Sequence, residues 1–380
     1  MILGVDASNI RAGGGVTHLV ELLRAANPPE HGFNKVIVWG GKSTLDKIDD
    51  RDWLYKAFDP LLDHNLLYRL FWQRFSLKKL AEEAECDVVF MLAGYDISGF
   101  NTVVFISQNL LPFEWQEMLR DRRLLRLLRL LTIRFAQISS FRQAQGVIFL
   151  TSFARDVVLK NAGPLMCKTS IIPHGVSTHF FLTPRHQSKN MQFNKDRPFK
   201  IIYVSIVELY KHHSNVVEAV AMLRSVGIPV VLELIGPHGS GIRKLNETIN
   251  RVDVNREFVV YKGAVPYNKL HALYASADIG VFASSCETFG MILLEMMSAG
   301  LPIACSNRSA MPEVLGDAGL YFDPESAESI FITLRQLIDF RPLRDKYAQL
   351  SFERAKQYSW TKCTDETFRF LSEIGQGTAD

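Results

Sequence analysis

The chain has 380 residues, of which 47% are hydrophobic and 22% charged, a mixture that excludes disordered and fibrous proteins. Its 43 basic and 40 acidic residues give a net charge of +3, which is too balanced for a dedicated nucleic-acid-binding protein. The five cysteines are scattered and form no CxxC pair, which argues against a disulfide framework or zinc knuckle and favours a reducing compartment.

Short apolar runs alternate with helical patterns along the first part of the chain. The runs predict buried strands at Met1–Val5, Lys35–Trp39, Asp87–Leu92, Thr102–Ser107 and Gly146–Leu150. Intervening segments, such as 16–26 and 66–85, place apolar residues at the period of a helix. This alternation predicts a parallel sheet that is covered by helices on both faces.

The alternation stops in a polar stretch between residues 176 and 198 and then resumes. Further strands are predicted at Lys200–Val204, Val230–Ile235, Phe258–Tyr261, Asp278–Ala283 and Pro302–Ser306. We therefore predict two Rossmann-like α/β domains over residues 1–176 and 199–358, joined by a linker over 177–198. An amphipathic helix over 359–380 is expected to pack back toward the first domain.

The most informative segment follows the strand near Phe282. A loop over 287–290 opens a helix that runs from about Met291 to Ala299. Free N–H groups and the dipole at such a helix start suit a phosphate group. Glu287 in the loop and Glu295 inside the helix have a spacing that fits opposite ends of a nucleotide-diphosphate sugar. The alternative is an ordinary strand–loop–helix with two solvated glutamates.

This segment resembles the signature of retaining glycosyltransferases of family 4, E-x-F-G-x-x-x-x-E. The likeness continues through 299–302, 309–319 and 322–324. Upstream it includes the 172–176 turn, 262–263, Leu270, 273–274 and 277–278. The resemblance implies the GT-B fold, in which two Rossmann-like, doubly wound parallel-sheet domains face a cleft. It also implies that Glu287 binds the donor sugar and Glu295 the ribose. Main-chain amides are then expected to bind phosphate or sugar oxygens at Phe289, Gly290, Met291 and Ile292.

A second matching segment, from Ser205 to His212, follows the strand Lys200–Val204. Family members resemble E-P-R-K-N here, and an Arg–Lys pair holds the donor diphosphate. A cation at this place favours the transition state, because the leaving group gains charge. Lys211 occupies the lysine position and Ser205 and Tyr210 border the donor, but Tyr210 replaces the arginine.

That replacement leaves three outcomes open: slower turnover, help from another basic residue such as Arg243 or Lys244, or loss of activity. The alternative for Lys211 is an ordinary solvent-facing lysine.

Two loops of the first domain also resemble family sites. The glycine run before the helix near Val16 implies that Gly14 and Gly15 face the donor phosphates and the acceptor, although such a run alone indicates only a flexible turn. Asn109 follows the strand Thr102–Ser107, where many relatives have a histidine that contacts the transferred sugar. The alternative for Asn109 is a turn cap before Pro112.

Residues 119–142 contain seven arginines, one acid and many leucines. A basic amphipathic helix is typical of a membrane-surface element, and we expect peripheral contact with an anionic membrane. The alternative is a helix with a buried leucine face and a solvated arginine face. The sequence shows no signal peptide and no stretch long enough to span a bilayer, so we expect a cytoplasmic protein.

Together these patterns predict a retaining, metal-independent hexosyltransferase that takes a nucleoside-diphosphate sugar and modifies a hydroxyl of a glycan or lipid-linked glycan. The 208–211 region is similar to bacterial mannosyl- and rhamnosyltransferases of surface-polysaccharide assembly and favours GDP-mannose slightly. Glu287, Lys211 and Asn109 are the catalytic candidates. No cofactor and no nucleic acid are expected. No metal is expected either, because the histidines lack ligand spacing. The alternatives are a sugar-nucleotide epimerase of the same fold and an inactive binding protein, which the tyrosine at position 210 keeps open.

Overall fold

The computed structural model describes residues 1–187 and 193–377. Its contacts divide the chain into two compact units. The first unit comprises Met1–Trp115, Arg123–Gly175 and the chain from Tyr358 onward, and the second comprises Gln116–Arg122 and Val176–Gln357. Each unit is a parallel sheet with helices on its faces, so both have the predicted α/β class.

The sheet of the first unit has seven parallel strands in the order β3-β2-β1-β4-β5-β6-β7. The interior strand β1 pairs with β2 and β4, so that Val5 lies opposite both Val38 and Phe90. Most of these strands are continuous apolar runs because both faces of the sheet are covered. The strands are β1 Ile2–Ala7, β2 Lys35–Gly40, β3 Leu54–Phe58, β4 Val88–Met91, β5 Val103–Ser107, β6 Gly146–Phe149 and β7 Lys168–Ile171.

Helices follow the strands of the first unit in alternation. The α-helices are α1 Gly14–Arg24, α2 Lys42–Leu45, α3 Leu66–Trp72, α4 Lys78–Glu83, α6 Leu124–Gln143, α7 Ser152–Ala162 and α15 Trp360–Gln376. Shorter turns are η1 Pro28–His31, η2 Pro60–Asp63, the π-helical η3 Gln73–Leu77 and η4 Leu111–Phe113.

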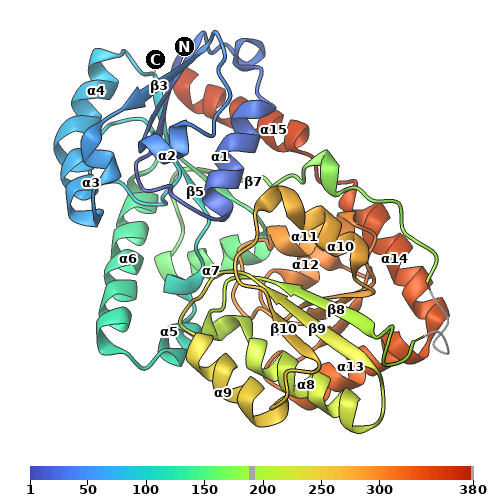
Figure 1. The fold of residues 1–380 in the computed structure, drawn as a ribbon. Coiled ribbons are helices and arrows are strands. Elements are labelled where there is room, and N and C mark those ends of the chain that lie inside the picture. The colour runs from blue at the N-terminus through green and yellow to red at the C-terminus, as the bar shows by residue number, and fades with distance from the viewer. Residues whose placement is uncertain (188–192, 378–380) are drawn as a thin grey trace. The chain divides into compact units, whose positions relative to one another are not determined.

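The terminal helix α15 packs within the first unit. Figure 1 shows α15, in red, beside α1, in dark blue, although they come from opposite ends of the chain. The Thr364 hydroxyl donates a hydrogen bond to the Leu22 carbonyl on α1 at 3.2 Å. Residues 378–380, which the predicted terminal helix included, lie outside the described residues.

The sheet of the second unit has six parallel strands in the order β10-β9-β8-β11-β12-β13. The order reverses between β8 and β11, which pair so that Ile201 lies opposite Ile279. In doubly wound sheets such a switch point opens a crevice at the carboxyl ends of the strands, where ligands bind. The strands are β8 Phe199–Val204, β9 Val230–Ile235, β10 Val259–Tyr261, β11 Ile279–Phe282, β12 Ile303–Ser306 and β13 Leu320–Phe322.

Helices cover both faces of this second sheet. In Figure 1 its strands β8, β9 and β10 run between α11 and α12 on one side and α8 and α13 on the other. The helices are α8 His213–Ser225, α9 Ile242–Val252, α10 Leu270–Ser276, α11 Met291–Ser298, α12 Met311–Leu315, α13 Ala327–Asp339 and α14 Arg341–Ala355. Shorter turns are η5 Thr178–Phe180, η7 Leu209–Lys211 and η8 Tyr267–Lys269.

The described part of the predicted linker packs on the second unit. The Leu182 N–H donates to the Ser298 carbonyl at 3.1 Å, and Arg185 forms an ion pair with Asp278 at 2.6 Å. Residues 188–192 of the predicted linker lie outside the described residues. The segment up to residue 187 is therefore attached to the second unit.

The arginine-rich stretch is not the single helix that the sequence suggests. It consists of α5 Trp115–Arg120 and α6 Leu124–Gln143, which are separated at 121–123. Arg134 donates to Asn161 at 2.6 Å, and Arg142 donates to the Ala162 carbonyl at 2.9 Å. These two arginines therefore hold α6 against α7 and its C-terminal end, and they do not belong to a uniformly solvated basic face.

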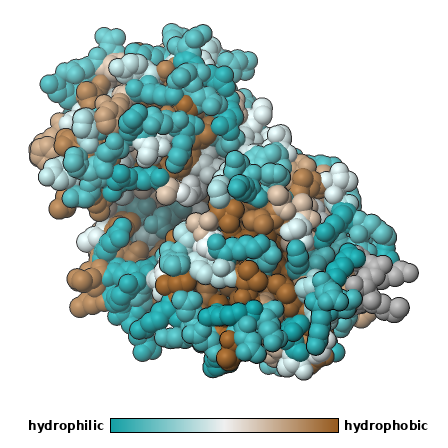
Figure 2. All heavy atoms as spheres, viewed as in Figure 1, coloured by the Kyte–Doolittle hydropathy of each residue, from teal (hydrophilic) through white to brown (hydrophobic). Residues whose placement is uncertain are grey.

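The leucines of α6 do not form one buried face, because Leu130 is buried and others are exposed. Leu125 is 83% and Leu124 67% exposed, and Phe135 on the same helix is 70% exposed. Figure 2 shows hydrophobic atoms among hydrophilic ones in the region where Figure 1 places α6. None of the helices within residues 1–187 and 193–377 combines the length and apolar character needed to cross a bilayer.

Candidate functional site

Two loops meet at the switch point of the second sheet. Strand β8 leads into Ser205–His212, and its neighbour β11 leads into 283–290. The Ser285 N–H and hydroxyl both donate to the Tyr210 carbonyl, at 2.9 and 3.1 Å. The two segments that the sequence singles out therefore form one site, held together by hydrogen bonds from Ser285 to the Tyr210 carbonyl.

Lys211 and Glu287 form an ion pair inside this site. The Lys211 Nζ atom contacts Glu287 Oε1, and the two side chains are only 9% and 17% exposed. The ammonium group also lies over the rings of Tyr210 and Phe282, 5.3 Å from each centroid. The Tyr203 hydroxyl fixes the turn by donating to the Lys211 carbonyl at 2.7 Å. Lys211 is thus no solvent-facing lysine, and Glu287 is no solvated glutamate.

The loop that carries Glu287 is anchored from the next strand. The Glu287 N–H donates to Ser309 Oγ at 2.8 Å, and the Ser309 hydroxyl donates back to the Glu287 carbonyl at 2.8 Å. Ser309 itself has a φ of 59°, an uncommon backbone conformation for a residue with a side chain. These reciprocal bonds fix the loop backbone, so the carboxylate of Glu287 projects from a rigid support.

Gly290 starts helix α11 with a φ of 89°, which glycine adopts without strain. A Cβ atom at this position would also lie only 2.8 Å from the Met311 Cε atom. Phe289 is buried beside it, and Met291 and Ile292 form the first turn of α11. The first N–H groups of a helix have no partner within it, so this turn presents donors and the positive end of the helix dipole.

Glu295 lies one turn inside α11 and is only 2% exposed. Burial raises the pKa of its carboxyl to about 8, and the Tyr274 hydroxyl donates to Oε2 at 2.9 Å. A hydrogen bond from the Tyr267 side chain also acts to lower this pKa, while Oε1 has no partner that meets ordinary hydrogen-bond geometry among the residues that the structure describes. A buried carboxyl with one unused oxygen is suited to a ligand hydroxyl.

Three further residues, Ser205, Arg243 and Lys244, lie less favourably for contact with the sugar donor. The Ser205 hydroxyl is buried and donates to the Ile206 carbonyl at 3.0 Å, so its hydrogen is already used. Arg243 is 90% exposed and lies 3.8 Å from Glu247. Lys244 lines a polar cavity of about 170 Å³ together with His212. Lys244 is therefore the better placed of the two proposed substitutes for the missing arginine.

The remaining predicted site residues lie in the first unit. Gly14 and Gly15 begin α1, directly after the turn that follows β1. Asn109 is exposed, and its Oδ1 accepts the Leu111 N–H at 3.3 Å, as the turn-cap alternative requires. A contact of Asn109 with the transferred sugar stays a prediction. The structure thus brings the candidates of residues 205–211 and 287–295 together and leaves three candidates in the other unit.

Sequence reasoning missed two residues that support this site. Tyr274 donates to Glu295, and Ser309 holds the Glu287 loop. Both lie in segments that carry the family resemblance. Their hydrogen-bond partners are distant in sequence, however, and the local spacing of residues does not predict such contacts. The only available signal was their presence in those segments.

Residues 185–354 match the sequence model of a family described as Glycosyl transferases group 1. O-antigen chain mannosyltransferase B of Escherichia coli is 40% identical over 110 residues, which are 29% of each protein. A GDP-mannose-dependent alpha-(1-6)-phosphatidylinositol dimannoside mannosyltransferase of Mycobacterium tuberculosis is 25% identical over 252 residues, 64% of this chain and 63% of that protein. The matched part therefore spans less than two thirds of the length of either relative.

A solved structure of similar fold is sucrose-phosphate synthase from Thermosynechococcus elongatus, with a TM-score of 0.79 and 15% identity. The match covers 99% of this chain and 100% of that one. The likeness confirms the predicted GT-B architecture of two Rossmann-like α/β domains.

Proposed function

We propose that this chain transfers a hexosyl group from a nucleoside-diphosphate sugar to a hydroxyl of a glycan, because residues 185–354 match the glycosyl transferases group 1 model. The observation that carries the proposal is the buried Lys211–Glu287 pair at the switch point of the second sheet. The reacting bond joins a diphosphate to a sugar. A cation in the crevice suits the diphosphate, and a carboxylate suits the hydroxyl groups of the sugar.

Lys211 acts on the leaving group in this proposal. The diphosphate gains negative charge as the glycosidic bond breaks, so a nearby ammonium stabilises the transition state more than the ground state. Without donor, Glu287 neutralises that ammonium. A bound diphosphate competes for Lys211, and Glu287 is then free to accept hydrogen bonds from sugar hydroxyls. Lys211 supplies the positive charge at the leaving group, so this step needs no metal ion.

The helix α11 binds the rest of the donor. The amides of its first turn, at Met291 and Ile292, donate to phosphate oxygens, as helix N-termini commonly do. Glu295 accepts a ribose hydroxyl through Oε1, the buried oxygen that has no partner of ordinary hydrogen-bond geometry within the described part of the chain. The donor therefore runs along the start of α11, from Glu287 at the sugar to Glu295 at the ribose.

We further propose that the anomeric configuration is retained. In a front-face reaction the departing phosphate takes the proton of the acceptor hydroxyl, so no separate general base is required. Asn109 is unable to act as one, because an amide does not accept a proton near neutral pH. Gly14 and Gly15 are proposed to present amides to the donor phosphates and the acceptor.

GDP-mannose is the proposed donor, and a lipid-linked glycan is the proposed acceptor. Support comes from the printed functions of the two relatives, one an O-antigen chain mannosyltransferase and the other GDP-mannose-dependent. An anionic membrane would hold such an acceptor near the enzyme. The exposed leucines of α6, beside Arg123, Arg126 and Arg129, are the surface that we propose contacts it.

The proposal is tested with a panel of nucleotide sugars and glycan acceptors, by measuring transfer and donor hydrolysis. Lys211→Ala is expected to lower kcat by about 10- to 100-fold, because each factor of ten corresponds to about 1.4 kcal/mol of lost transition-state stabilisation. Lys346→Ala, which changes an exposed lysine on α14 of the same unit, is the matched control and should leave kcat unchanged.

Removing one member of a buried pair destabilises the fold, so thermal unfolding is recorded for each variant and the double variant Lys211→Ala/Glu287→Ala is included. The epimerase alternative predicts an altered sugar nucleotide with no acceptor product. A parent protein without transfer or hydrolysis, whose nucleotide affinity does not respond to Lys211→Ala, would identify an inactive binding protein.

A further inference from the structure

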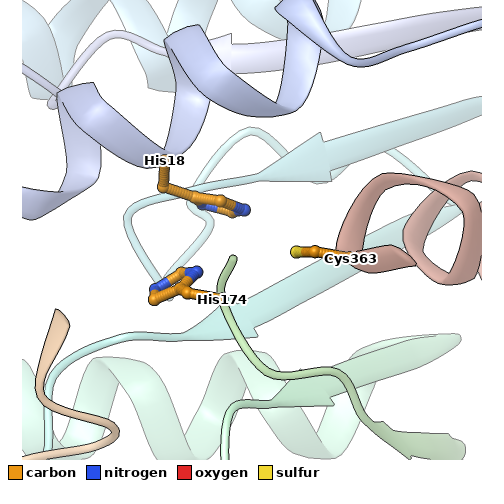
Figure 3. A group of neighbouring side chains, drawn as sticks. All are labelled: His18, His174 and Cys363. Carbon is orange, nitrogen blue, oxygen red and sulfur yellow. The ribbon is translucent and has the colours of Figure 1, made fainter. Parts of the chain in front are cut away.

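Three buried side chains from distant parts of the sequence meet inside the first unit. His18 lies on α1, His174 follows β7, and Cys363 lies on α15. Each offers one potential ligand atom, and these atoms all lie within 4.8 Å of one another. Figure 3 shows the three side chains pointing toward one another from their separate segments. The proposed transfer reaction uses none of them.

The two imidazoles of this cluster lie close to each other in a buried place. Their rings lie 4.6 Å apart between centroids, and Trp360 covers both, at 6.0 and 5.7 Å. Burial lowers the pKa of both histidines, which favours neutral imidazole, the form that binds metal ions.

The surroundings of His18 leave one ring nitrogen available. Its Nδ1 atom lies 2.7 Å from the Gln108 side-chain amide, while its Nε2 atom is buried and has no hydrogen-bond partner in the described residues. Metal-bound histidines commonly hydrogen-bond through one nitrogen to an oxygen and coordinate through the other. Rotating the side-chain amide of Gln108 by 180° exchanges its nitrogen and oxygen, so that the oxygen lies beside Nδ1. Nδ1–H then donates a hydrogen bond to that oxygen, and the unprotonated Nε2 faces the cluster.

The Cys363 sulfur is buried and has one main-chain donor beside it. Burial raises the pKa of the thiol to about 12, while a hydrogen bond from the Gly175 main chain acts in the opposite direction. The Thr367 hydroxyl is already used, because it donates to the Cys363 carbonyl at 2.7 Å. A cation at the centre of the cluster supplies the missing stabilisation, because metal coordination deprotonates a thiol.

We propose that His18, His174 and Cys363 bind one thiophilic metal ion, Cu⁺ or Zn²⁺, through two imidazole nitrogens and one thiolate sulfur. Binding forms one metal–sulfur and two metal–nitrogen bonds and releases the thiol proton to solvent. Bonds of about 2.0–2.3 Å place the ligand atoms about 3.5–4 Å apart, so the side chains close inward by about 1 Å.

Charge and coordination number distinguish the two ions. Cu⁺ and one thiolate are neutral together, whereas Zn²⁺ and one thiolate retain a positive charge that burial disfavours. A tetrahedral Zn²⁺ also requires a fourth ligand, such as water. The bound ion links α1, the segment after β7 and α15, and it therefore fastens the terminal helix to the start of the chain.

The test uses the full chain, stripped of metal with a chelator and kept reduced. Zn²⁺ alone and, in a separate oxygen-free arm, Cu⁺ alone are titrated, and bound metal per chain is measured after desalting. We expect about one ion per chain and a raised Tm, since a ligand of the folded state stabilises it by mass action. Cys363→Ala should abolish both effects.

The matched control is Cys86→Ala, because Cys86 is also buried in the first unit and its thiol pKa is likewise raised to about 12. That variant should bind metal like the parent. Should Cys363→Ala fail to fold, Co²⁺ added to the parent protein reports thiolate ligation through a sulfur-to-metal absorption band. A parent that takes up neither ion, uptake that survives Cys363→Ala, or a Co²⁺ complex without that band would overturn the proposal.

Discussion

Replacing Glu295 with glutamine should change how stability depends on pH. Burial raises the pKa of this carboxyl from 4.5 to about 8, so the folded chain keeps a proton that the unfolded chain releases. The stabilisation from that proton is complete below pH 4.5 and is lost as the pH rises through 8. Between pH 6 and pH 8 the free energy of unfolding of the parent should therefore fall by about 2 kcal/mol. The slope is about 1.4 kcal/mol per pH unit and becomes smaller as the pH approaches the pKa of the folded state.

Glu295→Gln keeps the shape of the side chain and still accepts the Tyr274 hydroxyl, but it has no proton to lose. Its free energy of unfolding, relative to that of the parent, should therefore rise by about 2 kcal/mol between pH 6 and pH 8. Taking the difference between the two proteins removes the contribution of all other titrating groups. Glu313→Gln, at an exposed glutamate of the same unit, should show no such difference.

The assay has to report on the second unit. All five tryptophans lie in the first unit, so tryptophan fluorescence would follow the wrong part of the chain. Amide hydrogen exchange in β11 and α11, measured at several pH values, gives the local free energy directly. A parent and a Glu295→Gln variant with the same pH dependence would show that the carboxyl is ionised in the folded state, and the reasoning would fail.

The same residue gives a separate binding prediction. Glu295→Ala should weaken the affinity for GDP by about 2- to 10-fold near pH 7, because a hydrogen bond to a neutral group contributes about 0.5–1.5 kcal/mol. Calorimetry measures this with the free nucleotide and requires no acceptor. Unchanged affinity in a folded variant would exclude the ribose role of Glu295.

Three further variants test other parts of the structure. Tyr210→Arg restores the missing cation and should raise the affinity for nucleoside diphosphate in calorimetry, and an unchanged affinity would show that position 210 does not face the phosphates. Gly290→Ala should lower the free energy of unfolding by about 1–3 kcal/mol and with it the Tm, because the φ of 89° and the Met311 contact disfavour a side chain. An unchanged Tm would contradict this. Combined Arg123→Glu, Arg126→Glu and Arg129→Glu should abolish flotation with anionic liposomes but spare GDP binding, and unaltered flotation would exclude α6 as the membrane contact.

The sequence by itself determined the fold class and most of the strands. Buried parallel strands have to be apolar on both faces, so β1, β5 and β8 stand out as continuous runs between helical patterns. Gly290 and the spacing of Glu287 and Glu295 were equally readable, because a loop, its helix start and the next turn are local in sequence. These features need no knowledge of which distant segment lies nearby.

The sequence did not determine which residues its arginines contact. The arginine-rich stretch appeared as one amphipathic helix, but it divides at 121–123, and Arg134 and Arg142 bond to residues at the C-terminal end of α7. The periodicity of apolar residues shows which side chains share a face of a helix, but it does not show what that face contacts. Only the packing of α6 on its neighbours decides which arginines remain in solvent.

Tertiary structure alone decided the two clusters that matter most here. Lys211 meets Glu287 because the strand order reverses between β8 and β11, which sets the loops after these strands side by side. His18 meets His174 and Cys363 because α15 returns to pack on α1. Neither meeting has a signature in local spacing, since chain topology and burial bring together residues that are far apart in sequence.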